Sequence, residues 1–307
     1  MKLYLAVVRG SCVRQNAGGR PVRPHSGECS YGVVFALVTW MFAAAIAPNA
    51  LAEENGPDES TWVAEMKKVH GRFDGKPGTF YQFGDSISES RASWSSMRWH
   101  ERKVTAEMKP AFESVKGHML EECWDRKGGQ FGNRSRMTIR WADENVDTWL
   151  KTLNPEAVSL MFGTNDLNSL GAEEYETTLR GVTAKCLDNG TVVILNTIPP
   201  RHGKAEKAAE FAGIARRVAR ELKVPLIDYQ AEILKRRPTD WDGALGSFSA
   251  YKGYDVPTLI ARDGVHPSNS KKHVGDFSAD GLKNNGFGLW NYLLLMKYAE
   301  VIDEVLN

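Results

Sequence analysis

The sequence predicts an α/β fold in which a parallel sheet is covered by helices on both faces. Short apolar segments alternate along the chain with longer segments of helical periodicity. The short segments are apolar at nearly every position, which is typical of strands buried on both faces of a sheet. Alternation of such strands with helices is typical of a parallel sheet between two helical layers.

Four segments carry the strand signal, and they are rich in β-branched or aromatic residues. They are residues 79–83, 157–162, 191–195 and 225–228. Apolar residues at steps of three and four predict helices over residues 173–187, 206–222 and about 290–306. In such a fold, ligands bind beyond the carboxyl ends of the strands, so the residues that follow each strand are the first candidates for a site.

Residues 1–52 have the composition of a secretory signal peptide. Basic residues up to Arg23 precede an uncharged stretch, and Ala50-Leu51-Ala52 fits a cleavage site. Cleavage after Ala52 predicts a secreted or periplasmic protein. A retained membrane anchor is the alternative, but the apolar centre at 33–47 is shorter than the roughly 20 residues that span a bilayer. The remainder, residues 53–307, is expected to form a single domain.

The charge balance excludes some partners. The chain has 39 basic and 38 acidic residues, and acidic residues slightly outnumber basic ones once residues 1–52 are set aside. We therefore expect no nucleic-acid partner, and membrane association only if the leader is retained. Export would permit a disulfide between Cys123 and Cys186, although two buried free thiols are equally compatible with the sequence.

Three polar motifs follow predicted strands or lie late in the chain. They are Gly84-Asp85-Ser86, Gly163-Thr164-Asn165-Asp166 and Asp263-Gly264-Val265-His266. A serine hydroxyl needs an adjacent base to attack a carbonyl, and a histidine held by a carboxylate is suited to that task. An asparagine amide can stabilise the oxyanion that forms. Together the motifs indicate acyl transfer, although each one alone is ordinary turn or capping chemistry.

These motifs resemble those of the SGNH/GDSL hydrolase family. The resemblance implies the SGNH hydrolase fold, a three-layer α/β/α sandwich with a mostly parallel, flavodoxin-like sheet. It also implies that Ser86 is the nucleophile, that His266 is the base and that Asp263 is its partner. The oxyanion hole would comprise the Ser86 N–H, the Asn165 amide and a glycine N–H, for which Gly132 fits best and Gly129 second. The α/β-hydrolase pentapeptide G-x-S-x-G is absent from the sequence.

The expected mechanism needs no metal and no cofactor. The chain has no H-E-x-x-H motif and no phosphate-binding loop of the Walker type. The remaining histidines, including His70, His118 and His202, have no metal-ligand spacing and are assigned to surface or core.

A long segment of little periodicity, residues 236–262, leads directly to Asp263. A connection of this length inside a compact domain is often functional. It contains Trp241, Tyr251 and Tyr254, which could stack on the rings of a sugar, or could simply pack the segment onto the domain.

The sequence therefore predicts a secreted serine esterase that removes small acyl groups, such as acetyl, from a small-molecule or carbohydrate ester. One alternative is a lipase, lysophospholipase or thioesterase of the same family. Another is a binding module that keeps the fold without catalysis.

Overall fold

The structure is a computed structural model that describes residues 59–99 and 104–307. The predicted signal peptide, residues 1–52, lies outside this range. In the described part of the chain the strands are β1 Phe80–Gly84, β2 Ala157–Met161, β3 Val192–Asn196 and β4 Leu226–Ile227. The α-helices are α1 Glu59–His70, α2 Ser86–Glu89, α3 Met108–His118, α4 Ile139–Leu153, α5 Ala172–Asp188, α6 Ala205–Leu222, α7 Tyr229–Arg236, α8 Ala279–Asn284 and α9 Gly286–Val301.

The four strands form one parallel sheet in the order β1-β2-β3-β4. Beyond β1, Asn133 makes an isolated parallel bridge with Gly84. If this bridge is counted as a rudimentary second strand, the order across the sheet is 2-1-3-4-5, which is the flavodoxin-like order. All residues of β1, β2 and β3 are buried, as expected of a sheet covered on both faces.

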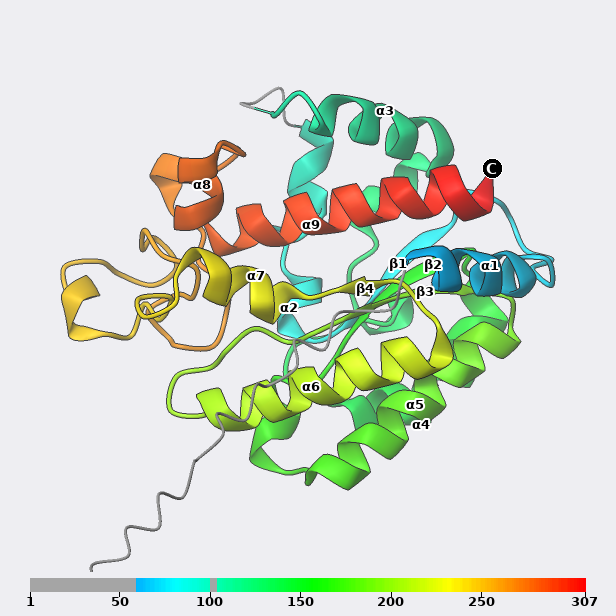
Figure 1. The fold of residues 1–307 in the computed structure, drawn as a ribbon, viewed down its shortest axis with the longest axis horizontal. Coiled ribbons are helices and arrows are strands. Elements are labelled where there is room, and N and C mark those ends of the chain that lie inside the picture. The colour runs from blue at the N-terminus through cyan, green and yellow to red at the C-terminus, as the bar shows by residue number, and fades with distance from the viewer. Residues whose placement is uncertain (1–58, 100–103) are drawn as a thin grey trace, which may run out of the picture. The chain divides into compact units, whose positions relative to one another are not determined.

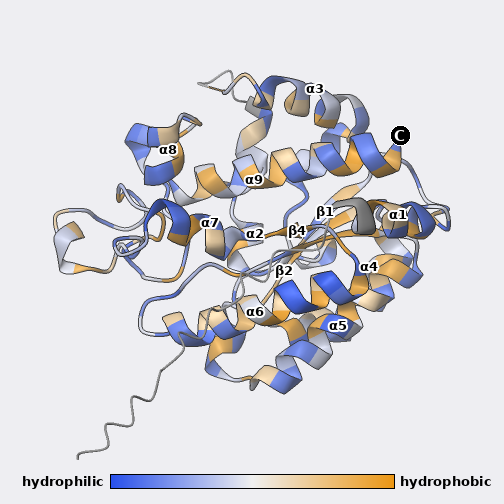
Figure 2. Cartoon of the chain, viewed as in Figure 1, coloured by the Kyte–Doolittle hydropathy of each residue, from blue (hydrophilic) through white to orange (hydrophobic). Residues whose placement is uncertain are grey.

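Helices cover the two faces of the sheet. Figure 1 shows α3 and α9 on one side of the strands and α4, α5 and α6 on the other. Figure 2 shows hydrophobic residues along the strands, whereas α6 carries both hydrophilic and hydrophobic residues. The buried face of α6 includes Phe211, Ile214 and Val218, so its apolar stripe packs inward. The predicted three-layer α/β/α arrangement is confirmed.

The predicted strands and two of the predicted helices agree with the structure to within one or two residues. The last helix begins earlier than expected, at Gly286 rather than near Trp290. The side chain of Asn285 accepts a hydrogen bond from the Gly288 N–H at 2.7 Å and caps this start. From Ile302 to Leu306 the chain continues as a π-helical turn.

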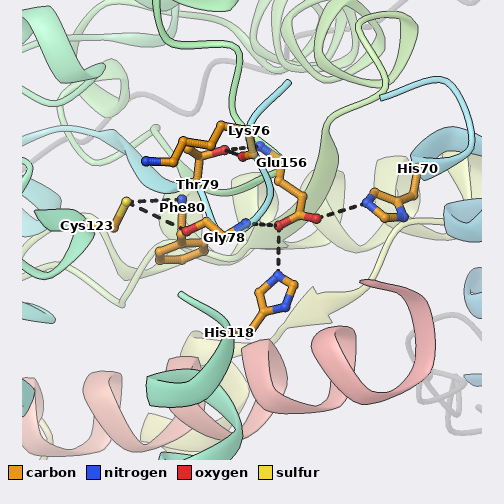
Figure 3. Close-up of polar contacts among 8 residues, drawn as sticks. All are labelled: His70, Lys76, Gly78, Thr79, Phe80, His118, Cys123 and Glu156. Atoms are coloured by element: carbon orange, nitrogen blue, oxygen red, sulfur yellow. Dashed lines mark hydrogen bonds and ion pairs between the residues drawn. The ribbon is translucent and has the colours of Figure 1, made fainter. Parts of the chain in front are cut away.

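A buried carboxylate joins several elements at the amino end of β2. Glu156 immediately precedes β2 and accepts hydrogen bonds from His70 at 3.0 Å, His118 at 2.8 Å and the Gly78 N–H at 2.6 Å (Figure 3). Burial acts to raise the pKa of Glu156, but these hydrogen bonds hold it below its usual value. The carboxylate thereby ties the ends of α1 and α3 to the start of the sheet.

The two cysteines of the described residues are buried and unpaired. Cys186 packs in the core on α5, and Cys123 lies beside β1, where its sulfur accepts a hydrogen bond from the Phe80 N–H. Of the two possibilities left open by the sequence, the structure has the free thiols. None of the described helices combines the length and the apolar character that crossing a bilayer requires.

Candidate active site

Ser86 lies at the carboxyl end of β1, as the first residue of the short helix α2. Asp85 caps this helix by accepting the Ile87 N–H at 3.0 Å. The turn is tight, because a Cβ at Gly84 would approach the Ser88 hydroxyl to 2.1 Å. The Ser86 N–H begins the helix and makes no hydrogen bond within the described residues. Both the hydroxyl and the N–H of Ser86 are therefore available to a ligand.

The loop before α8 brings a histidine and an aspartate to Ser86. His266 Nε2 lies 2.8 Å from Ser86 Oγ, and His266 Nδ1 lies 2.7 Å from Asp263 Oδ2. The other Asp263 oxygen accepts the N–H groups of Val265 and His266. Burial acts to raise the pKa of Asp263, but the hydrogen bonds from His266 and from these backbone groups hold it below its usual value. An ionised Asp263 fixes the His266 tautomer that can accept a proton from Ser86.

Asn165 follows β2 and faces the same cavity as Ser86. Its Nδ2 donates to the Met137 carbonyl at 2.9 Å and, in a longer contact of 3.3 Å, to Asp85 Oδ2. Arg201 holds this turn by donating to the Thr164 carbonyl at 2.7 Å. The amide is thus oriented by one good hydrogen bond and one weak one.

Two acidic side chains lie buried beneath the cavity. Burial, together with the nearby Asp166 charge, raises the pKa of Asp85 to about 7 against the opposing hydrogen bond from the Ile87 N–H. Burial also raises the pKa of Asp166 to about 6, although one of its oxygens accepts the Ile139 N–H. Both acids belong to the motifs that follow β1 and β2, and their role here is to cap α2 and α4.

Lys127 supports the turn of Ser86 from inside the molecule. Its ammonium group donates to the Ser88 carbonyl at 2.7 Å, to Gln82 Oε1 at 2.8 Å and to the Ser93 carbonyl at 3.1 Å. Burial lowers the pKa of Lys127 to about 7. No pattern in the sequence indicates this role, because a half-buried lysine is identified only by its surroundings.

A cavity of about 480 Å³ opens at Ser86 and His266. Such a volume suits a small ligand. Sequence reasoning missed several of its lining residues. They are Glu89, Ser90, Ser135, Arg136, Val265 and Phe287.

Gly132, the predicted oxyanion donor, does not line this cavity. Its N–H donates to the Gly129 carbonyl at 3.2 Å, and its carbonyl accepts the Gly84 N–H at 3.0 Å. It has a φ of +82°, and a Cβ there would lie 2.2 Å from the Phe83 ring. In this geometry the Gly132 N–H is bonded within the protein, and the glycine is needed for close packing against β1. Its role as an oxyanion donor stays a prediction. Gly129, the second choice, does not line the cavity either.

Arg136, from the same segment as Gly132, does line the cavity. It does so together with Ser86 and Asn165, and it has a φ of +69°, in the left-handed region that a bulky residue rarely adopts. Its backbone N–H makes no hydrogen bond within the described residues. Such strain often occurs at functional sites. The Arg136 N–H is accordingly the better candidate for a donor from this segment.

The three aromatic residues predicted to contact substrate lie in different places. Tyr254 lines the cavity, and its ring centroid lies 5.7 Å from that of His266. Trp241 packs against the hydrophobic core instead. Tyr251 is exposed beside Phe248 and does not line the cavity. Only Tyr254 is therefore placed to contact a ligand at Ser86, because the irregular segment turns the other two rings away.

No group of three or more His, Cys, Asp or Glu side chains among residues 59–99 and 104–307 has the arrangement of a metal site. His202 resembles His266 in having an aspartate partner, because its Nδ1 lies 2.5 Å from Asp242 Oδ2. No serine is bonded to its ring within the described residues, so His202 and Asp242 form a pair without a nucleophile.

Comparison with known proteins identifies the family of the chain. A sequence model of the GDSL-like lipase/acylhydrolase family matches residues 83–270, which include all three motifs. The chain belongs to this family. It is a carboxylic ester hydrolase.

Several solved structures are similar to the hydrolase. An acetylxylan esterase of Geobacillus stearothermophilus is 18% identical with a TM-score of 0.46, over 74% of the hydrolase and 96% of the esterase. The psychrotrophic esterase EstA of a Pseudoalteromonas species is 13% identical with a TM-score of 0.46, over 74% and 99% of the two chains. No curated protein sequence matches the hydrolase.

Proposed function

We propose that the hydrolase removes small acyl groups, chiefly acetyl, from carbohydrate esters by a Ser86–His266–Asp263 mechanism. The observation that carries the proposal is the unbroken chain of hydrogen bonds from Ser86 Oγ through His266 to Asp263 at the mouth of a cavity. In this mechanism His266 takes the proton of Ser86 as the hydroxyl attacks the ester carbonyl, and then gives it to the leaving alcohol. Water then attacks the acyl carbonyl while His266 takes its proton, and His266 returns this proton to Ser86 Oγ as the carboxylic acid leaves.

The oxyanion would be held by donors from residues that line the cavity. The Ser86 N–H and the Arg136 N–H make no competing hydrogen bond within the described residues. The Asn165 amide is held in place by the Met137 carbonyl, and an oxyanion would replace or share its longer contact with Asp85. Each such donor is typically worth about 3 kcal/mol to the transition state.

The character of the cavity supports a short acyl group and a hydroxyl-rich alcohol. Most of the residues that line it have polar or charged side chains, among them Glu89, Ser135 and Arg136. A long acyl chain would need a mainly apolar channel to leave water favourably. Tyr254 offers a partly exposed ring beside His266, on which a sugar ring can stack.

Two measurements test the proposal. A fluorophosphonate probe should label the wild type, and the Ser86→Ala variant should not be labelled. The acetyl ester of a chromogenic alcohol should then be hydrolysed faster than its octanoyl ester. A preference for octanoyl would favour a lipase-like enzyme, and absence of labelling in the wild type would favour a binding module.

We further propose that the hydrolase is exported and that residues 1–52 are its signal peptide. The uncharged stretch after the basic leader and the Ala50-Leu51-Ala52 sequence support this. Expression in a bacterial host with an outer membrane, followed by N-terminal sequencing of the periplasmic fraction, should give a chain that begins at Glu53. Recovery of the chain with its leader in the membrane fraction would indicate a retained anchor instead.

A further inference from the structure

The cavity at Ser86 adjoins a second cavity of the same size. We call the first the ester cavity and the second, lined by Lys252, Asp255, Asn269 and Lys271, the lysine cavity. Each has a volume of about 480 Å³. They share the residues Ser90, Tyr254 and Phe287. A ligand with its ester at Ser86 can therefore extend past Tyr254 into the lysine cavity.

Positively charged groups outnumber negatively charged ones along the two cavities. Arg136, Lys252 and Lys271 are the cations, and Glu89 and Asp255 are the acids. The excess is notable because the chain beyond residue 52 is slightly acidic as a whole.

Both acids already accept hydrogen bonds from the protein. Glu89 accepts from the N–H and the hydroxyl of Ser135. Asp255 accepts the Lys271 N–H at 2.8 Å and lies 3.8 Å from the Lys271 ammonium group. Their negative charges are thus engaged before any ligand arrives.

Two of the cations have no such partner. Neither the Lys252 ammonium nor the Arg136 guanidinium makes an ion pair or a side-chain hydrogen bond within the residues that the structure describes. Asn269 accepts from Asn285, but its own amide hydrogens have no acceptor in that part of the chain. The donors that face the lysine cavity are therefore in excess of its acceptors, which favours an anion.

We propose that the ester hydrolysed at Ser86 belongs to a substrate that also carries a carboxylate, and that the lysine cavity binds this carboxylate. The inference rests on the proposed function. The ester sits at Ser86, the body of the substrate crosses the face of Tyr254, and the carboxylate lies near Lys252 and Lys271. An acetylated uronic acid, with the carboxylate on the alcohol side, has this chemistry. A dicarboxylic acid monoester, with the carboxylate on the acyl side, has it too.

The test compares two pairs of substrates of the full-length hydrolase. One pair is an acetylated methyl hexoside and the acetylated methyl uronoside that differs only by the carboxylate. The other is the acetyl and the succinyl ester of one chromogenic alcohol. Exposed cations contribute modestly, so we expect kcat/KM to favour the carboxylate-bearing member of one pair by about ten-fold. The preferred pair shows on which side of the ester the carboxylate lies. Raising the salt concentration from about 10 mM to about 1 M should remove the preference by screening.

Variants link the preference to the lysine cavity. In Lys252→Met and Lys271→Met, the ratio of kcat/KM for the charged over the neutral substrate should fall about five-fold each. Lys67→Met changes an exposed lysine on α1 that has no ion pair in the described structure, and it should leave the ratio unchanged. The thermal unfolding temperature of each variant shows whether a fall in kcat/KM is caused by a destabilised fold rather than by the lost charge.

The outcomes separate the two proposals. Hydrolysis of acetyl esters with no preference for charge in either pair would overturn the carboxylate site and leave the esterase mechanism intact. A preference that Lys252→Met and Lys271→Met do not change would overturn it as well. If the wild type hydrolyses none of the esters and no fluorophosphonate labels Ser86, the proposed function itself fails.

Discussion

His266 Nε2 lies 2.8 Å from Ser86 Oγ, although 180 positions of sequence separate the two residues. The parallel sheet places Ser86 at the carboxyl end of β1, and the irregular loop before α8 carries His266 to it. The same edge of the sheet also holds Asn165.

Ser86 and His266 are expected to act as one unit. Ser86→Ala and His266→Ala should each lower kcat by roughly 10⁴–10⁶-fold, and the double variant should be little worse than either. Steady-state kinetics with an acetyl ester measures this. His202→Ala serves as the control, because His202 has an aspartate partner but no serine. Losses that multiply in the double variant would show that the two residues act independently.

Asn165→Ala should lower kcat by about 10²–10³-fold with a small change in KM, because an oxyanion donor acts mainly in the transition state. The matched control is Asn168→Ala, which removes an exposed amide from the same turn. An increase of KM alone would show instead that Asn165 binds the ground state of the substrate.

Gly132→Ala should destabilise the fold. The new Cβ would meet the Phe83 ring at 2.2 Å and hold alanine at a φ of +82°. Overpacking and the left-handed backbone together should cost about 2–4 kcal/mol in the free energy of unfolding, measured with a denaturant. Gly117→Ala lies on α3 with no atom within 4 Å, and it should be neutral or slightly stabilising. Equal stability of the two variants would contradict the tight packing at Gly132.

Glu156 should make stability depend on acidic pH. Its folded-state pKa lies below the ordinary value of 4.5, so the ionised form stabilises the fold above that pH. This stabilisation is lost as the pH falls through the folded-state pKa. Glu156→Gln should therefore lower the free energy of unfolding at neutral pH by about 1–3 kcal/mol, and the difference from wild type should shrink below about pH 4.5.

The control for Glu156 is Glu113→Gln, an exposed position on α3 with no ion pair in the described structure. It should change stability little at any pH. The activity of Glu156→Gln should persist where the protein stays folded, because Glu156 precedes β2 and the ester cavity lies beyond the carboxyl ends of the strands. A difference from wild type that is constant between about pH 3 and 7 would contradict the ionised carboxylate.

Features that follow from strand order could be predicted from the sequence. The apolar segments located β1 to β3 to within one residue, and a parallel sheet places the residues after β1 and β2 at one edge. The proximity of Ser86 and Asn165 therefore follows from the strand pattern alone. The position of His266 followed from the family resemblance rather than from periodicity.

Features that depend on the path of a loop could not be predicted. Which backbone N–H faces the ester cavity depends on the φ values between Gly132 and Arg136, and a glycine in that segment is equally explained by packing. Trp241 and Tyr254 belong to one irregular segment, and no period assigns them to a face. The meeting of Glu156 with His70 and His118 joins distant parts of the chain and leaves no short-range pattern.

The reactivity of the two buried thiols can be used to follow how this fold unfolds. Burial raises the pKa of Cys186 to about 12 and raises that of Cys123 as well, so neither reacts as a thiolate while it is enclosed. Cys123 lies beside β1, and Cys186 lies on the buried face of α5. The rate at which each is alkylated therefore measures the exposure of a different part of the molecule. If the hydrolase opens all at once, the two cysteines will be modified together.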